Sequence, residues 1–238
     1  MGGGGFATLQ LTMPPDKLYF HAKSAAVPPG KGVHEQVADE AAYAALWTSA
    51  PRWRAALCDT WESHFQFEGG GRTSFDSVDH VMKLAWQLLA FRAAEARGEL
   101  PELHRMSFRI FCVEHNRSHI MSFPWLRMEP ADQAMWEAEK EELRAAAQFA
   151  KFSQVAALRA VLLGTGEAEL WELRSRGQKP AERAWSLEKV RKALREGRTE
   201  LPAAEEEDAD SDSETDAAED EAGTNPPYVN VSFIERRI

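Results

Sequence analysis

The chain has 238 residues, of which 44% are hydrophobic and 10% aromatic, a composition that excludes a wholly disordered protein. Its formal net charge of −10 arises in one segment, because the run 205–221 holds 11 acidic residues and no basic one. The rest of the chain is balanced, with 28 basic residues against the remaining 27 of the 38 acidic ones. It therefore lacks the basic excess that marks many nucleic-acid-binding domains.

Two cysteines, Cys58 and Cys112, stand far apart and outside any Cys-x-x-Cys spacing. This pattern argues against a disulfide framework and against a zinc site, and it favours a reducing, intracellular compartment. No run of residues approaches the length and apolarity of a membrane helix, so we expect no membrane contact. The sequence indicates neither a metal site nor a cofactor.

In the first third of the chain we expect short elements. Residues 1–16 are rich in glycine and predict a flexible arm, and the globule opens with a short strand at 18–21. A helix should follow Asp39 as its N-cap, and a short second helix should span 53–57. Alternating aromatic residues at 65–67, followed by three glycines, predict a hairpin that returns through residues 73–75.

The middle of the chain carries the clearest helical patterns. Apolar residues recur at three- and four-residue spacing from Ser77 to Arg97, with Asp76 placed as the N-cap. The alternating segment 107–113 predicts a strand. Helix should restart at Pro130 and continue through 131–152.

Further along, helical segments are expected at 155–163 and 168–173, and a last helix should run from a Ser186 cap to Gly197. The domain organisation that follows is a domain at 17–200, an acidic linker at 201–225 that is disordered in isolation, and a C-terminal segment at 226–238.

The C-terminal segment alternates like a strand and predicts an attachment site for a protein partner, which it would join as an added strand. The residues expected to make this contact are Tyr228, Val229, Val231, Phe233 and Ile234. A basic cluster on the last expected helix could contact a nucleic acid. The simpler interpretation is that these side chains form the solvent-exposed face of the helix. The members of the cluster are Lys189, Arg191, Lys192 and Arg195.

Three blocks of the sequence resemble the NADAR family, also called YbiA-like, which is associated with NAD and ADP-ribose. The first is Leu-Tyr-Phe-His-Ala-Lys-Ser at 18–24, with Pro-Gly-Lys-Gly at 29–32. The second is Ser-Val-Asp-His at 77–80. The third is Ala-Lys-Phe-Ser-Gln at 150–154, followed by Leu-Leu-Gly-Thr-Gly-Glu-Ala-Glu-Leu-Trp at 162–171. The resemblance implies a mainly helical α+β fold with small β elements.

Members of this family resemble N-glycosidases, which cut a bond between a base and ribose in riboflavin precursors or in ADP-ribose attached to guanine. Such chemistry needs a carboxylate near the departing sugar and a cation for phosphate, and in a covalent route an amine traps the sugar carbon. The chain departs from the family where this chemistry is expected. Cys58-Asp59 replaces Ser-Asn, and Lys83 and Trp86 stand at the family's Gln and Lys. An indole cannot form a Schiff base, so the covalent route is closed at Trp86.

The resemblance and the residue types together give six candidate site residues. The candidate catalytic carboxylates are Asp79 and Asp59, although Asp79 also suits a first-turn acid that stabilises a helix N-terminus. The candidate ligand-binding residues are Lys23, Lys31, His80 and Lys151. Each has a simpler structural interpretation: a surface turn for Lys31, a helix-surface position for His80, and packing over Phe152 and Trp171 for Lys151.

We therefore expect a mainly helical α+β domain that is a catalytically degenerate member of the family and serves as a structural or interaction subunit of an assembly. Two alternatives stay open. One is an active N-glycosidase acting on an ADP-ribose-like or riboflavin-precursor substrate, and the other is a non-catalytic nucleotide-binding module.

Overall fold

The structure is a computed structural model that describes residues 16–23, 27–32, 34–38, 40–69, 72–100, 123–173 and 180–202. The expected strand at 107–113, the second cysteine, residues 203–225 of the acidic linker and the C-terminal segment lie outside the described residues. So do residues 1–15 of the expected arm and Asp39, the expected cap of the first helix. The helices are α1 (Glu40–Ser49), α2 (Trp53–Ala56), α3 (Val78–Ala96), α6 (Pro130–Gln154), α7 (Ala156–Gly164) and α8 (Trp185–Arg195). The strands are β1 (Lys17–Phe20), β2 (Phe65–Gly69), β3 (Arg72–Phe75), β4 (Glu169–Glu172) and β5 (Glu182–Arg183).

These elements make a mainly helical α+β fold, as the sequence predicts. The strands form two small sheets: a three-stranded sheet in the order β1-β4-β5, and the β2–β3 hairpin. Strand β1 pairs parallel to β4, and β5 pairs antiparallel to β4. Within the described residues no helix has the length and apolarity that a bilayer crossing requires.

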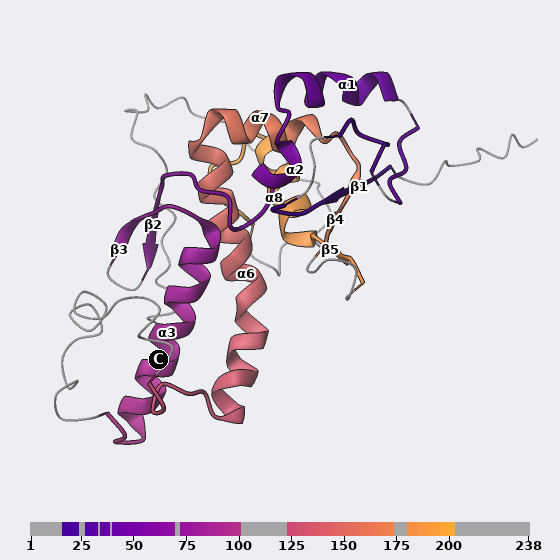
Figure 1. Ribbon diagram of the computed structural model, residues 1–238. Coiled ribbons are helices and arrows are strands. Elements are labelled where there is room, and N and C mark those ends of the chain that lie inside the picture. Colours follow the sequence, from indigo (N-terminus) through magenta and orange to yellow (C-terminus); the bar gives the residue numbers. More distant parts are fainter. Residues whose placement is uncertain are drawn as a thin grey trace, which may run out of the picture.

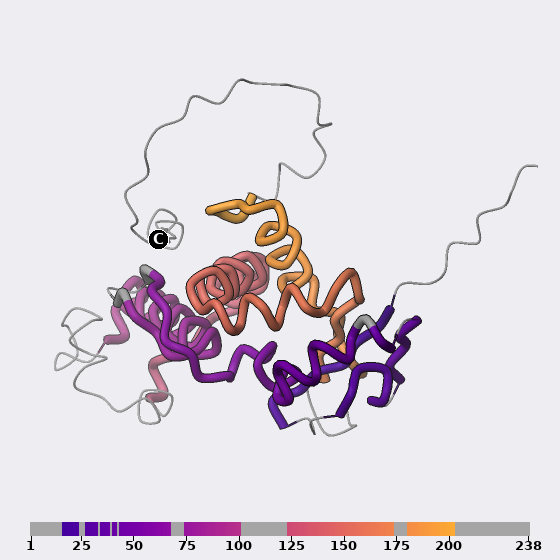
Figure 2. The backbone as a smooth tube through the Cα atoms, turned by 90° about the horizontal axis from the view of Figure 1, so that it is seen from above, coloured from indigo at the N-terminus to yellow at the C-terminus, as the bar shows by residue number. Residues whose placement is uncertain are grey.

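The long helix α6 is the centre of the fold. It packs against α3, α7, α8 and the hairpin. Figure 1 shows α3 and α6 running antiparallel, with the sheet, α1, α2 and α7 gathered at one end, and Figure 2 looks along this pair of helices. Residue Pro130 begins α6, and Glu129 and Asp132 form a capping box around it, in which the Glu129 N–H donates to Asp132 Oδ2 at 3.1 Å.

Apolar side chains form three clusters, and the first two include residues of α6. The first joins the sheet to α2, α7 and α8 and includes Phe20, Trp53 and Phe152. The second lies between the hairpin and the α3–α6 pair, and the third lies near the far end of that pair. Full burial of a large apolar side chain contributes roughly 1.5–3 kcal/mol, so these clusters supply the main driving force for folding.

Two expectations about local structure are wrong. Residues 169–172 form strand β4 rather than helix, because β1 supplies backbone partners along their whole length. The N-cap of α3 is Ser77 rather than Asp76, since the Ser77 hydroxyl accepts the His80 N–H at 3.2 Å. In addition, α8 begins at Trp185 with Ala184 in the cap position, one residue before the expected Ser186 start.

Candidate functional site

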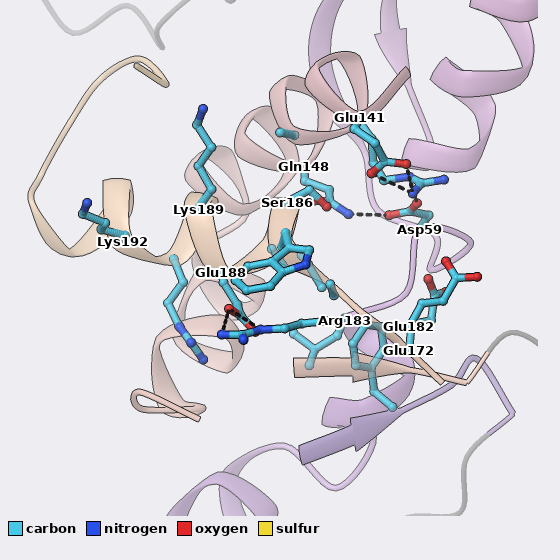
Figure 3. Close-up of a pocket in the computed structure, with 18 of the residues that line it drawn as sticks. Asp59, Glu141, Gln148, Glu172, Glu182, Arg183, Ser186, Glu188, Lys189 and Lys192 are labelled. Atoms are coloured by element: carbon cyan, nitrogen blue, oxygen red, sulfur yellow. Dashed lines mark hydrogen bonds and ion pairs between the residues drawn. The ribbon is translucent and has the colours of Figure 1, made fainter. Parts of the chain in front are cut away.

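A cleft of about 1060 Å³ opens between α6, α8 and the β4–β5 end of the sheet. Figure 3 shows that its lining side chains come from segments far apart in the sequence. The loop after α2 contributes Asp59, helix α6 contributes Arg144 and Gln148, and the stretch from β5 into α8 contributes most of the rest. This cleft is our candidate functional site.

Asp59 is one of eight acidic residues that line the cleft, and its side chain is 20% exposed. The Gln148 amide donates to Asp59 Oδ1 at 2.8 Å, and Arg144 Nε lies 3.2 Å from Asp59 Oδ2. Burial raises the pKa of the Asp59 carboxyl, while Arg144 and the Gln148 hydrogen bond act in the opposite direction. Figure 3 shows Gln148 and Asp59 pointing toward one another. Asp59 is thus a carboxylate held in a fixed position and accessible from the cleft.

Gln148 also carries a buried polar atom without a partner. Its side chain lines the cleft, yet only 3% of the residue is exposed, and its Oε1 atom has no hydrogen-bond partner among the described residues. A buried carbonyl without a donor costs about 1–3 kcal/mol. The Oε1 atom is itself covered by the fold, so this cost is internal to the protein and marks no contact point for a ligand.

Trp185 also lines the cleft and presents an aromatic ring that is 63% exposed. The guanidinium carbon of Arg183 lies 3.6 Å from the centroid of the ring. Arg183 is fixed in turn by ion pairs with Glu188 at 3.0 Å and with Glu169 at 3.1 Å. Trp185 is therefore a platform held by Arg183, with most of its surface open to solvent.

The basic cluster predicted on the last helix divides into two kinds of side chain. Arg191 is buried and donates to Thr165 Oγ1 at 2.7 Å and to the Ala168 carbonyl at 2.8 Å. Burial lowers the pKa of the Arg191 guanidinium. Arg195 bonds to Glu167 and to the Gly166 carbonyl. These two arginines hold the 165–168 turn, so the four bases do not form a continuous basic face.

The other two members, Lys189 and Lys192, line the cleft and make no side-chain hydrogen bond or ion pair with any described residue. Figure 3 shows them extending from α8, with their ammonium groups directed away from Asp59. They are the cations of the cleft that remain available to an anion from outside the fold.

Among the six residues predicted for the site, only Asp59 lines the cleft. Asp79 lies on the first turn of α3 and pairs with Lys83 at 2.7 Å on the helix surface. The Asp79 N–H donates to the Asp59 carbonyl at 3.0 Å, so the two candidate carboxylates are neighbours through the backbone. His80 packs edge-on against Phe75, with the ring centroids 5.4 Å apart.

The two predicted lysines of the N-terminal segment lie elsewhere. Lys23 is exposed, in a turn where its N–H donates to His21 Nδ1 at 3.0 Å. Lys31 pairs with Glu40 at 2.7 Å, and both side chains are more than half exposed. The structure thus does not bring Lys23 or Lys31 into the cleft.

Lys151 is fully buried, so it neither reaches the cleft nor extends to solvent over Trp171. Its ammonium donates to the carbonyls of Ala56 at 3.2 Å and Cys58 at 2.9 Å, at the C-terminal end of α2. The last carbonyls of a helix lack intrahelical partners, and a cation is favourable there. Lys151 is therefore a cap for α2 that fixes the loop carrying Asp59.

The remainder of the Ala-Lys-Phe-Ser-Gln block also has structural contacts. Phe152 is fully buried in the first cluster. The Gln154 side chain accepts the Gln66 N–H at 2.7 Å and donates to the Gln66 carbonyl at 2.8 Å, as a neighbouring strand would. This block thus joins α6 to α2 and to the hairpin.

We expect the burial of Lys151 to make stability depend on pH. Burial lowers the pKa of Lys151 to about 8, against 10.5 for an exposed lysine. Above pH 8 the folded chain has lost this proton while the unfolded chain keeps it, so stability rises with pH. The expected gain between pH 7 and pH 9 is about 1 kcal/mol. Burial also raises the pKa of Cys58 to about 12, so above about pH 9 the loss of the thiol proton from the unfolded chain offsets the rise and stability levels off.

Urea unfolding at pH 7, 8 and 9 measures this effect. Lys151→Met should abolish the rise, whereas Lys140→Met, which removes a solvent-accessible lysine of the same helix, should keep it. A wild-type stability that stays level or falls from pH 7 to pH 8.5 would contradict the assignment.

A buried ion pair that sequence analysis did not identify organises the Pro-Gly-Lys-Gly loop. The Glu35 side chain is 0% exposed, that of Arg54 is 4% exposed, and Arg54 Nη2 lies 2.6 Å from Glu35 Oε2. Glu35 also accepts the N–H groups of Tyr19 and Gly32 at 3.0 Å. Arg54 donates to the carbonyls of Val27, Pro28 and Tyr19. This pair connects the loop to β1 and α2.

A second polar array lies on the outer face of the hairpin. Ser74 Oγ is 3.0 Å from His64 Nε2, and His64 Nδ1 is 3.3 Å from Asp76 Oδ1. The His64 and Asp76 side chains are 70% and 63% exposed, and none of the three residues lines the cleft. Residues 64 and 76 flank the paired residues Phe65 and Phe75, so this array is explained as cross-strand pairing.

No group of His, Cys, Asp and Glu side chains in the described part of the chain is arranged to hold a metal ion. No family model matches the chain, and neither a curated protein nor a solved structure shows significant similarity to it. The interpretation of the cleft therefore depends on its own geometry and on the sequence blocks described above.

Proposed function

We propose that the chain is a catalytically degenerate member of the NADAR family whose cleft binds an ADP-ribose-like nucleotide without cleaving it. In this proposal the protein is a binding subunit of a larger assembly, with the C-terminal segment at 226–238 as its attachment site. That segment lies outside the described residues, so its role stays a prediction. The observation that carries the proposal is the composition of the cleft.

Three features of the cleft suit three parts of such a ligand. The exposed ring of Trp185 offers a stacking surface for the base. Lys189 and Lys192 offer free cations for the phosphates. The Asp59 carboxylate, which lines the cleft with its side chain 20% exposed, offers an acceptor for ribose hydroxyls. A volume of about 1060 Å³ is ample for one nucleotide.

The proposal that the protein does not cleave its ligand is supported by where the fold places the residues at the positions of the family's chemistry. Asp79 is paired with Lys83 on the surface of α3 and does not line the cleft. Trp86 packs against the third apolar cluster. Lys151 is buried as a cap for α2. Asp59 alone reaches the cleft, and there Arg144 and Gln148 already occupy its oxygens.

One observation favours the second candidate, an active N-glycosidase. Burial raises the pKa of Asp59, and a carboxyl with a raised pKa can transfer a proton to a departing base. In that case Asp59 would be the catalytic acid, and Asp59→Asn would abolish turnover while preserving the hydrogen bond to Gln148.

Two measurements on the full chain separate these candidates: a titration with ADP-ribose, and an incubation with ADP-ribosylated guanosine analysed for free ADP-ribose. We expect saturable binding and no release above the rate without protein. Release that is lost in Asp59→Asn would establish the N-glycosidase instead. If neither binding nor release occurs, the nucleotide proposal is wrong.

A further inference from the structure

The cleft contains two cations that the fold leaves unused. Arg144 and Arg183 are held in ion pairs with carboxylates, Arg195 is bound to Glu167, and Arg191 is buried against the 165–168 turn. Lys189 and Lys192, by contrast, have no side-chain partner among the described residues. They lie one turn apart on α8, and both residues line the cleft. Both ammonium groups can therefore pair with carboxylates or phosphates.

A dense source of carboxylates follows the same helix in the sequence. The described chain ends at Pro202, and after two alanines the run 205–221 begins, with 11 acidic residues and no basic one. Helix α8 rises about 1.5 Å per residue, so Lys189 lies on the order of 10 Å along the axis from its C-terminal end. An extended chain spans about 3.3 Å per residue, so the acidic run is long enough to return to both lysines.

We propose that the acidic run 205–221 of the same chain docks on Lys189 and Lys192 and competes with anionic ligands for the cleft. The docking is inferred from two things alone: the opposite charges of the run and the lysines, and the length of chain that separates them. The competition rests on the function proposed above. The contact needs no fixed conformation, since many carboxylates can replace one another at two ammonium groups.

The strength of this contact is limited by solvent. Exposed ion pairs are individually weak and are screened by salt, so two of them reduce ligand affinity by about two- to tenfold at low ionic strength. The tether raises the local concentration of carboxylates to the millimolar range, which keeps the contact populated in a single chain. At 0.5 M salt the effect should disappear, because the screening length falls to about 4 Å.

Zero-length cross-linking of the full chain tests the docking. A carbodiimide joins carboxylates to amines in direct contact, and peptide mass spectrometry locates the links. We expect links from 205–221 to Lys189 and Lys192 within one chain, at several times the yield of links to Lys23, an exposed lysine outside the cleft. Equal yields at all three lysines, or links formed only between chains, would overturn the proposal.

A second arm tests the competition. In one variant every Glu and Asp of 205–221 is replaced by Gln and Asn, which keeps the length and removes the charge. We expect this variant to bind ADP-ribose two- to tenfold more tightly than the wild-type chain at low salt and equally at high salt. In the Lys189→Gln/Lys192→Gln background the same replacement should have no effect.

The cross-linking and the ADP-ribose titration test separate claims, so each can contradict its own claim without the other. Selective cross-links without any ADP-ribose binding would overturn the proposed function and leave the docking established. ADP-ribose binding without selective cross-links would overturn the docking and leave the proposed function intact.

Discussion

Replacement of Arg54 by Met should lower the free energy of unfolding by about 3–5 kcal/mol, the usual cost of removing one partner of a buried ion pair. The substitution leaves the Glu35 carboxylate buried without its cation. It also leaves the carbonyls of Val27, Pro28 and Tyr19 without their donor. Both losses act on the Pro-Gly-Lys-Gly loop and on its attachment to β1. Urea unfolding of the full chain measures the change.

The matched control is Lys31→Met. Lys31 forms an ion pair in the same loop, but its side chain and that of Glu40 are exposed, so the expected loss is below about 1 kcal/mol. The double variant Glu35→Leu/Arg54→Met should recover part of the loss, because it removes the unpaired buried charge. A loss below 1 kcal/mol in Arg54→Met itself would show that the pair does not organise the loop.

Replacement of Trp185 by Ala should weaken ADP-ribose binding by about 5- to 150-fold, because stacking of a base on an aromatic ring contributes about 1–3 kcal/mol. The ring is largely exposed, so the fold should keep its stability. Trp185→Phe should retain most of the affinity, since a phenyl ring keeps a stacking face. Isothermal titration calorimetry measures all three proteins.

Trp47→Ala provides the control for this prediction. Trp47 is the other large apolar side chain that is exposed in the described residues, and it lies on α1, outside the cleft. Its removal should leave ADP-ribose affinity unchanged. If the two alanine variants weaken binding equally, Trp185 is not the stacking surface.

The sequence predicts the elements whose signal is local. The periodic helix α3 and the Pro-initiated helix α6 are confirmed, as are β1 and the hairpin. The error at 169–172 has a non-local cause. The segment Glu-Leu-Trp-Glu carries no strong strand signal, and its conformation is set by pairing with β1, some 150 residues earlier in the chain.

The cleft also depends on non-local contacts, so the sequence does not predict it as a whole. Its side chains come from the loop after α2, from α6, from the end of the sheet and from α8, and only the fold brings them together. One signal was present in the sequence. Arg144 and Gln148 are four residues apart, so one face of a helix carries both, and both contact Asp59. By contrast, Lys151 and Arg191 carry the charge expected of ligand-binding residues, but both side chains are buried and serve contacts within the fold.

The measurement that tests the central claim most directly is calorimetric titration of the full chain with ADP-ribose, with the nucleotide then recovered and analysed. The account predicts saturable binding at one site per chain, with the nucleotide recovered unchanged. Absence of binding at millimolar ADP-ribose and low salt, in both the wild-type chain and the variant with a neutralised acidic run, would contradict it.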